Sequence, residues 1–344
     1  MSDILLLVLS AVLCGANDWD EIALFGRQQE SWLRKYGSFP HGIPSHDTIN
    51  RVFSLIDPDE FSACFSRWIQ GKRKRFDNKK ELVAIDGKRI CNSYTGQDTH
   101  SAVHMVSALA TLNNLCLGQV PTSTKSNEIT AIPELLDLLD VEGDVISIDA
   151  MGCQTEIAAK IIDSKADYIL AVKSNQLTLE DDIDHTVRNI VPVDCSTETD
   201  MGHGRIEIRS CCVYQDFRYI ENLENWKKLS SIVKIEAERI IKSTGKTTQE
   251  TRYYISSLKT SAEEFNQYIR KHWGVENKLH WVLDVTFKED DSRKRKGNAP
   301  KNFNTVLKYA LTLLDNDMSI SDSYKRKRFK AALNLEYRQK LLLF

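Results

Sequence analysis

The stretch ELVAIDGK, residues 81–88, decides the fold because it is a short apolar run with a carboxylate near its end. Polar segments bound it on both sides, and the preceding one is the basic run KRKRFDNKK at 72–80. An apolar run of this length between polar segments is typical of a buried central strand. An ionised aspartate at the end of such a strand is costly unless it is paired or bound to a metal. Asp86 is therefore either part of an Asp-Gly turn or a functional carboxylate.

A second stretch, DVISIDAM at 144–151, repeats this arrangement with Asp149 at the end of an apolar strand. The intervening sequence predicts a hairpin over 100–122 and a helix over 125–140. A further helix and strand follow, so the predicted order is β-β-β-α-β-α-β. Parallel crossovers are right-handed, which allows the two aspartate-bearing strands to be neighbours in one mixed sheet. Both carboxylates would then face the crevice at the C-terminal ends of the strands, where open α/β sheets bind ligands.

The flanking segments differ from this core. Residues 1 to about 78 show helical periodicity, which favours a packing domain, with DNA contact as the alternative. Residues 191–258 alternate with period two, which predicts a β-rich insertion. A helix is expected to begin after Ser261, because Ser261 and Glu264 have the spacing of a capping box.

The continuation of this helix carries a third candidate carboxylate, Glu276, with His272 and His280 at i−4 and i+4 on the same face. One interpretation is a zinc site, although the HExxH spacing and a further ligand are missing. A second is a structural helix surface. The third joins Glu276 to Asp86 and Asp149, because hard divalent ions such as Mg²⁺ prefer oxygen ligands. Other carboxylates that compete with Glu276 for this place are Asp284, Glu289, Asp290 and Asp291.

Composition limits the class of protein. The formal net charge of the 344 residues is −2, but residues 288–344 hold 14 Lys and Arg against 7 Asp and Glu, which permits an anionic partner. The apolar segment 4–16 is too short to span a bilayer and lacks a positive flank, so neither a membrane span nor a signal peptide is expected. The eight cysteines are scattered without a CxxC motif, which favours reduced thiols in the cytoplasm over disulfides.

Several stretches resemble the H-repeat-associated transposases, a group of DDE-type transposases of bacterial insertion sequences. The resemblance covers nearly the whole chain. The matching stretches are AIDGK at 84–88, VISIDAMGCQTEIAAKII at 145–162, ADYILAVKSNQ at 166–176, GHGRIEIR at 202–209 and RKHWGVENKLHWVLDVTFKEDDSR at 270–293, together with HGIPSHDTINRVFSLIDP at 41–58. The second and fifth of these stretches are together specific for the family.

This resemblance implies an α/β protein in which an RNase H-like mixed sheet is flanked by helices. The expected parts are a helical N-terminal domain at 1–78, a first catalytic part at 79–190, a β-rich insertion at 191–258, a second catalytic part at 259–316 and a basic helical tail at 317–344. The family's DDE trio falls on Asp86, Asp149 and Glu276, with two Mg²⁺ or Mn²⁺ ions as cofactors. The implied reaction is cleavage and transfer of DNA strands by a homodimer bound to transposon ends and target. The alternatives are an inactive DNA-binding protein and a nuclease without strand transfer.

Contacts with DNA phosphates are expected beside strand ends, in the Gly-flanked turn, near Glu276 and in the basic run at 293–301. These residues are Lys88, Lys173, His203, Arg205, Arg270, His272, Arg293, Lys294, Arg295 and Lys296. A second basic run, KRKRFK at 325–330, is similar. Trp273 and Trp281 are expected to belong to the core rather than to stack on bases.

Overall fold

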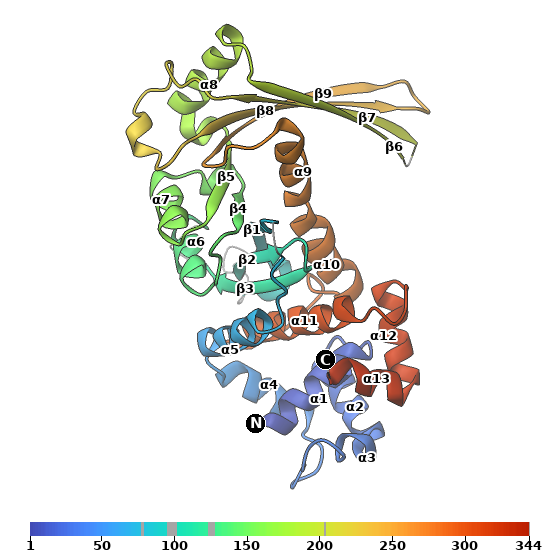
Figure 1. Cartoon of the computed structure of the whole chain (residues 1–344). Helices are drawn as coiled ribbons and strands as arrows, with labels where there is room; N and C mark the ends of the chain where they lie inside the picture. The colour runs from blue at the N-terminus through green and yellow to red at the C-terminus, as the bar shows by residue number, and fades with distance from the viewer. Residues whose placement is uncertain (77–78, 95–101, 123–127, 203, 344) are drawn as a thin grey trace.

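The computed structural model describes residues 1–76, 79–94, 102–122, 128–202 and 204–343 (Figure 1). Within these residues nine strands form a single sheet in the order β3-β2-β1-β4-β5-β9-β8-β7-β6. The first five strands form the centre of the molecule, and the last four extend from it as an arm at the top of Figure 1. Helices from both ends of the chain lie below the sheet in the same view.

The central strands have an RNase H-like arrangement, which confirms the expected fold class. Strands β1 (Leu82–Arg89), β2 (His104–Ala110) and β3 (Leu115–Pro121) are antiparallel, and β1 runs parallel to β4 (Val145–Ile148), which runs parallel to β5 (Asp167–Val172). Helices α6 (Glu128–Asp137) and α7 (Thr155–Asp163) connect them. Val83 and Ile85 face one core and Ala84 faces another. A strand buried on both faces reads as a continuous apolar run, as residues 82–85 do.

The predicted β-rich insertion continues this sheet. Helix α8 (Leu177–Asn189) leads into β6 (Asp194–Gly202), β7 (Arg205–Tyr214), β8 (Ser231–Ile241) and β9 (Thr247–Ser256). These four strands are antiparallel, and β9 pairs with β5. The arm is therefore joined to the core by backbone hydrogen bonds.

Helix α9 (Ala262–His272) packs its apolar face, including Phe265 and Ile269, against the arm. As expected, Ser261 caps it by accepting a hydrogen bond from the Glu264 backbone. The capping box is incomplete, because the Glu264 carboxylate accepts a hydrogen bond from Thr260 instead. A π-helical turn, Val275–His280, follows and leads into α10 (Trp281–Phe287).

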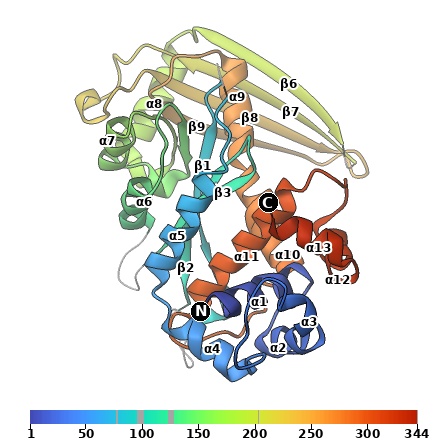
Figure 2. The ribbon, with the colours of Figure 1, turned by 60° about the horizontal axis from the view of Figure 1, so that its bottom comes forward.

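The two ends of the chain share one core. Helices α1 (Ser2–Leu13), α2 (Trp19–Gln28), α3 (Glu30–Leu33), α4 (His46–Leu55) and α5 (Pro58–Gln70) are followed after the sheet by α11 (Ala299–Asn316), α12 (Tyr324–Leu333) and α13 (Leu335–Leu342). Figure 2 shows α1 beside α11 and α13, and their apolar side chains form a common cluster. Arg328 of the second basic run is buried and donates to the Val12 carbonyl. None of the described helices is both long and apolar enough to cross a bilayer.

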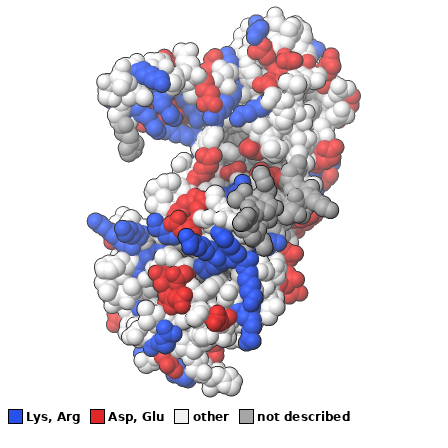
Figure 3. All heavy atoms as spheres, turned by 180° about the vertical axis from the view of Figure 1, so that it is seen from behind, with Lys and Arg blue, Asp and Glu red and all other residues white. Residues whose placement is uncertain are grey.

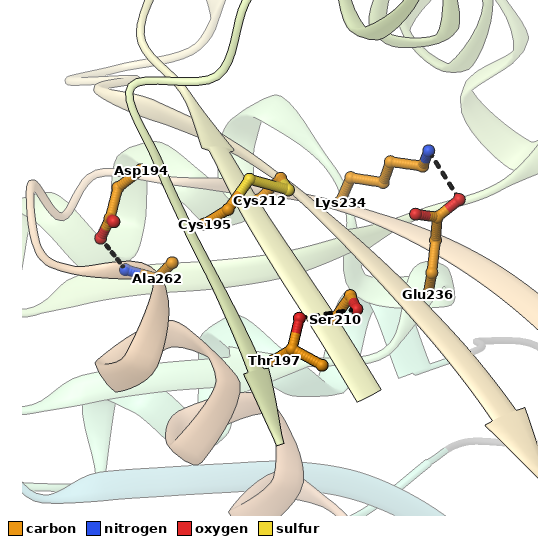
Figure 4. The surroundings of a disulfide bond; sticks show 8 residues. All are labelled: Asp194, Cys195, Thr197, Ser210, Cys212, Lys234, Glu236 and Ala262. Carbon is orange, nitrogen blue, oxygen red and sulfur yellow. Dashed lines mark hydrogen bonds and ion pairs between the residues drawn. A yellow bond between two sulfur atoms is a disulfide. The ribbon is translucent and has the colours of Figure 1, made fainter. Parts of the chain in front are cut away.

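The cysteine prediction was wrong at one pair. Cys195 on β6 and Cys212 on β7 are directly opposite in the strand register and form a disulfide (Figure 4). Seventeen residues separate them, and the hairpin that brings them together was not visible as a cysteine motif. Cys14, Cys64, Cys91, Cys116, Cys153 and Cys211 are free.

Candidate active site

Two aspartates come together where β4 ends beside β1. Ile85 and Ile148 are register partners in the parallel pair, so Asp86 and Asp149, which follow them, project from adjacent positions. Asp149 ends its strand and caps a short 3-10 turn by accepting a hydrogen bond of 3.1 Å from the Met151 backbone. Asp149 thus follows its strand as expected, whereas Asp86 lies within β1, which continues to Arg89 because residues 86–89 still pair with β2.

A cavity of about 230 Å³ joins these aspartates to Glu276. Asp86 and Asp149 enter it from the sheet, and Glu276, which is exposed, enters it from the π turn. The other residues that line the cavity include Ser147, Lys173, Arg252, Tyr254, His272 and Trp273. Three carboxylates from separate elements are the oxygen donors that Mg²⁺ and Mn²⁺ prefer, so this donor set fits a hard divalent ion.

His272, at the end of α9, and His280, at the end of the π turn, lie in different surroundings. His272 Nδ1 lies 2.8 Å from Ser147 Oγ, and burial lowers the pKa of His272, which favours its neutral form. His280 is buried with Nε2 3.3 Å from Asp86 Oδ2. His272 is thus directed to Ser147 and His280 to Asp86, rather than both to Glu276, so the zinc interpretation is not supported. The partly buried His272 turns to the sheet rather than to solvent.

The charge of Asp149 is poorly compensated within the described residues. Burial raises the pKa of Asp149, and the nearby carboxylates of Glu128 and Asp86 raise it further. Such a shift marks a carboxylate whose negative charge would be stabilised by an added cation. This electrostatic state agrees with the donor set of the cavity.

Glu128 at the start of α6 is a residue of this neighbourhood that the sequence analysis missed. Its carboxylate lies 3.0 Å from His104 Nε2, and this hydrogen bond raises the pKa of His104. A Cβ atom on Gly87 would lie only 2.1 Å from Glu128 Oε1, so the glycine after Asp86 leaves the room that Glu128 occupies. The sequence signal was an acidic residue in the first helical turn, which a helix dipole explains equally well.

A second group of carboxylates surrounds Lys88. Its ammonium lies 2.6 Å from Glu289 Oε2, also pairs with Asp284, and is 4.0 Å from Asp290. The ligand atoms of these three acids lie within 4.8 Å of one another. We call this group the Lys88 cluster. It corrects two expectations: Lys88 is directed to internal acids rather than to DNA, and the competing carboxylates Asp284, Glu289 and Asp290 are already neutralised in part.

Two positively charged side chains line the cavity of the three carboxylates. Lys173 is exposed and lines it, and its contact with a DNA phosphate stays a prediction. Arg252 on β9 lines it too, with its guanidinium 4.4 Å from the centre of the Trp273 ring. The sequence analysis missed Arg252, because a strand residue of the insertion gives no signal that it will reach the core.

Three further expected DNA contacts lie on α9, on the arm or outside the described residues. Arg270 pairs with Asp200 on β6, and Arg205 lies 3.8 Å from Glu207. His203 lies outside the described residues. Figure 3 shows the face of the molecule that is hidden in Figure 1. On this face, Lys and Arg side chains form a band across the helical part and gather again under the overhanging arm, with acidic side chains between them.

The basic run at 293–296 divides into buried and accessible residues. Lys294 is buried, donates to the Asn17 carbonyl at 2.6 Å and lies 3.8 Å from the centre of the Phe303 ring. Burial lowers the pKa of Lys294 to about 8. Lys294 is thus a structural residue, which corrects its expected contact with DNA. Arg293 and Lys296 are exposed.

Trp281 also differs from expectation. The sequence favoured a core position, but 58% of its surface is exposed. The π turn explains this difference, because an i→i+5 hydrogen bond runs from the Trp281 backbone to the Glu276 carbonyl and changes which side chains face inward. Trp273 is partly buried beneath Arg252.

Comparison with known proteins places the chain in a family. Residues 51–313 match the model described as a transposase DDE domain, and residues 1–69 match the model of a region associated with it. The chain is 44% identical to YncI of Escherichia coli O157:H7, named a candidate transposase, over 99% of this chain and 89% of that protein.

A second relative agrees. The chain is 42% identical to YhhI of Escherichia coli K12, named an H repeat-associated candidate transposase, over 98% of this chain and 90% of that protein. Among solved structures, a piggyBac transposase synaptic complex with hairpin DNA aligns over 99% of this chain and 72% of that chain, with 11% identity and a TM-score of 0.47.

Proposed function

The chain belongs to the DDE transposase family, and from this premise we propose that it cleaves and transfers DNA strands by metal-assisted phosphoryl transfer. The observation that carries the proposal is the shared cavity of Asp86, Asp149 and Glu276. Metal-assisted phosphoryl transfer needs carboxylates that converge on one site. These three reach a single cavity from two strands and a π turn, which a group of carboxylates on the open surface would not do. In this proposal they hold two Mg²⁺ or Mn²⁺ ions.

When bound, such ions would lower the pKa of an attacking water and stabilise charge on the attacking and leaving oxygens. In the first step a water oxygen attacks the phosphorus and the water loses a proton, while the DNA 3′-oxygen leaves and takes up a proton to become a 3′-hydroxyl. In the second, the freed 3′-hydroxyl attacks a target phosphodiester, loses its proton, and the target's 3′-oxygen leaves. Asp86 and Asp149 hold the reacting centre from the sheet side, and Glu276 closes it from the helix side.

The surrounding residues would orient the DNA. Lys173 and Arg252 line the cavity, where cationic side chains would meet the phosphates on either side of the reacting one. His280 beside Asp86 restricts the position of that carboxylate. Arg205 on the arm and Arg270 on α9 would face DNA that extends beyond the cavity, in competition with their acidic partners.

The proposal includes the organisation inferred from sequence. Residues 79–190 and 259–316 supply the catalytic part, 191–258 the arm, and 1–78 with 317–344 the helical part. The expected DNA partners are the ends of an insertion sequence and a target site. We further propose that two copies bind these ends as a homodimer in the cytoplasm.

A strand-cleavage assay with labelled DNA ends, an unlabelled target and Mg²⁺ tests the function. We expect cleaved and joined products that disappear with a chelator and in Asp149→Asn. The matched control is Asp181→Asn, which removes an exposed carboxylate on α8 outside the cavity. Cleavage without joining would identify a nuclease, and binding without cleavage would identify a DNA-binding protein.

A further inference from the structure

We propose that Arg293 and Arg295 form a second anion site, which binds a phosphate of the DNA outside the catalytic cavity. The inference rests on the proposed function for the identity of its ligand. The two arginines line a cavity of about 510 Å³ together with Asn92, Tyr94 and Asp291. This cavity shares no lining residue with the one that holds Asp86, Asp149 and Glu276.

Arg295 is held in place before any ligand binds. Its Nε donates to the Asn92 carbonyl at 2.9 Å, and its guanidinium lies 4.0 Å from the centre of the Tyr94 ring. Within the described chain, its two terminal nitrogens have no hydrogen-bond partner in this arrangement. A guanidinium that is held by a hydrogen bond from Nε and by stacking on a ring still has its two terminal NH₂ groups free. These groups can bind two phosphate oxygens in a bidentate way. Less side-chain entropy is lost when such a residue binds.

The charges of the cavity favour an anion. Arg293 and Arg295 contribute two permanent positive charges, since guanidinium groups do not titrate in proteins. Asp291 also lines the cavity, but its carboxylate lies 3.9 Å from the Lys288 ammonium, which offsets its charge in part. Asn92 and Tyr94 are uncharged polar residues, so nothing further opposes an anion among the described lining residues.

The position of the cavity connects it to the catalytic centre. Asn92 and Tyr94 follow β1, the strand that carries Asp86. The segment is fixed to the loop after α10, because Asn92 donates to the Asp290 carbonyl and the Cys91 backbone donates to the Asp290 carboxylate at 3.2 Å. DNA that reaches the catalytic cavity would thus pass the C-terminal end of β1, where this second site lies.

The site divides the basic run at 293–296 by function. Arg293 and Arg295 line the cavity, whereas Lys294 between them points into the protein, to Asn17 and Phe303. Alternating directions are what an extended segment produces. A single run of four basic residues therefore provides two ligands and one structural anchor.

The test is the salt dependence of DNA affinity, measured on a duplex without Mg²⁺. Losing one phosphate contact reduces the slope of log K against log salt by about 0.9. We expect this reduction in Arg293→Ala and in Arg295→Ala. The control Arg188→Ala removes an exposed arginine on α8, distant at the top of Figure 1, and should leave the slope unchanged. Lys294→Met should lower the melting temperature and leave the slope unchanged.

Two further variants keep the test decisive. Arg295→Lys retains the charge but not the fork, so we expect a nearly unchanged slope with weaker binding at every salt concentration. Tyr94→Leu should weaken binding, because it removes the ring that holds Arg295. Slopes for Arg293→Ala and Arg295→Ala equal to that of Arg188→Ala would overturn the site. Because this assay measures binding alone, a protein that shows the expected slopes but never cleaves DNA would contradict the proposed function and retain the anion site.

Discussion

Two groups of carboxylates lie along β1, and they differ in what compensates their charge. Asp86, Asp149 and Glu276 come from three separate elements and line an open cavity. The acids of the Lys88 cluster come from one short segment and close around an internal ammonium. The second group is the more compact of the two. Proximity alone therefore does not identify a metal site: the better candidate is the group whose charge no internal cation satisfies.

The largest effect should come from neutralising the open group. Asp86→Asn, Asp149→Asn and Glu276→Gln should each reduce cleavage by about a thousand-fold or more, since metal-based charge stabilisation is worth several kcal/mol. Steady-state cleavage rates with Mg²⁺ measure this loss, and circular dichroism checks the fold. A variant that cuts at the wild-type rate would remove that residue from the trio, and Asp290 would be the next candidate for the place of Glu276.

Removing the internal cation should affect stability instead. Lys88→Met leaves Glu289, which is 2% exposed, without its charged partner, so the free energy of unfolding should fall by about 3–5 kcal/mol. Adding Glu289→Gln should restore part of this loss. Urea unfolding measures both changes, with Lys173→Met as the exposed control. A Lys88→Met protein as stable as the wild type would show that the cluster does not depend on its ammonium.

In the metal-free protein, the charge of Asp149 in the open group should also affect stability, but less than the loss of Lys88 does. The pKa of Asp149 is raised in the folded protein, so its ionisation opposes folding. The wild-type protein therefore loses stability as the pH rises from the pKa of an unfolded aspartate, about 3.9, through the raised pKa of Asp149 in the folded protein. Asp149→Asn should therefore stabilise the metal-free protein at pH 7 by about 0.5–2 kcal/mol, the usual gain from relieving an unfavourable charge.

Urea unfolding in the presence of a chelator, repeated from pH 4 to pH 7, measures this effect. The difference between wild type and Asp149→Asn should grow with pH over that range. A difference that is constant with pH, or a less stable variant at pH 7, would mean that the Asp149 charge is compensated in the fold.

Local patterns in the sequence were sufficient to predict the two aspartate-bearing strands. Each is an apolar run that ends in a carboxylate, and parallel pairing of such runs leaves few arrangements. The partners of Lys88 and Lys294 could not be predicted, because Glu289 and Asn17 are about 200 and 280 residues away in sequence. A basic residue with a distant internal partner has the same local pattern as one that binds DNA.

The π turn could not be predicted for a different reason. Helical periodicity assumes 3.6 residues per turn, and a single wider turn changes the face of every residue that follows. Glu276 was inferred from the family motif as well as from the helix face, and its role stays a prediction. Trp281 was expected in the core and is exposed.

Direct titration of Mn²⁺ binding most sharply tests the claim that the open group, not the Lys88 cluster, is the metal centre. The electron paramagnetic resonance signal of free Mn²⁺ would be followed in wild type, Asp149→Asn and Asp284→Asn. We predict that Asp149→Asn weakens binding at least about ten-fold, as losing an anionic oxygen ligand should, and that Asp284→Asn binds as the wild type does. Wild-type binding by Asp149→Asn together with lost binding by Asp284→Asn would contradict the account.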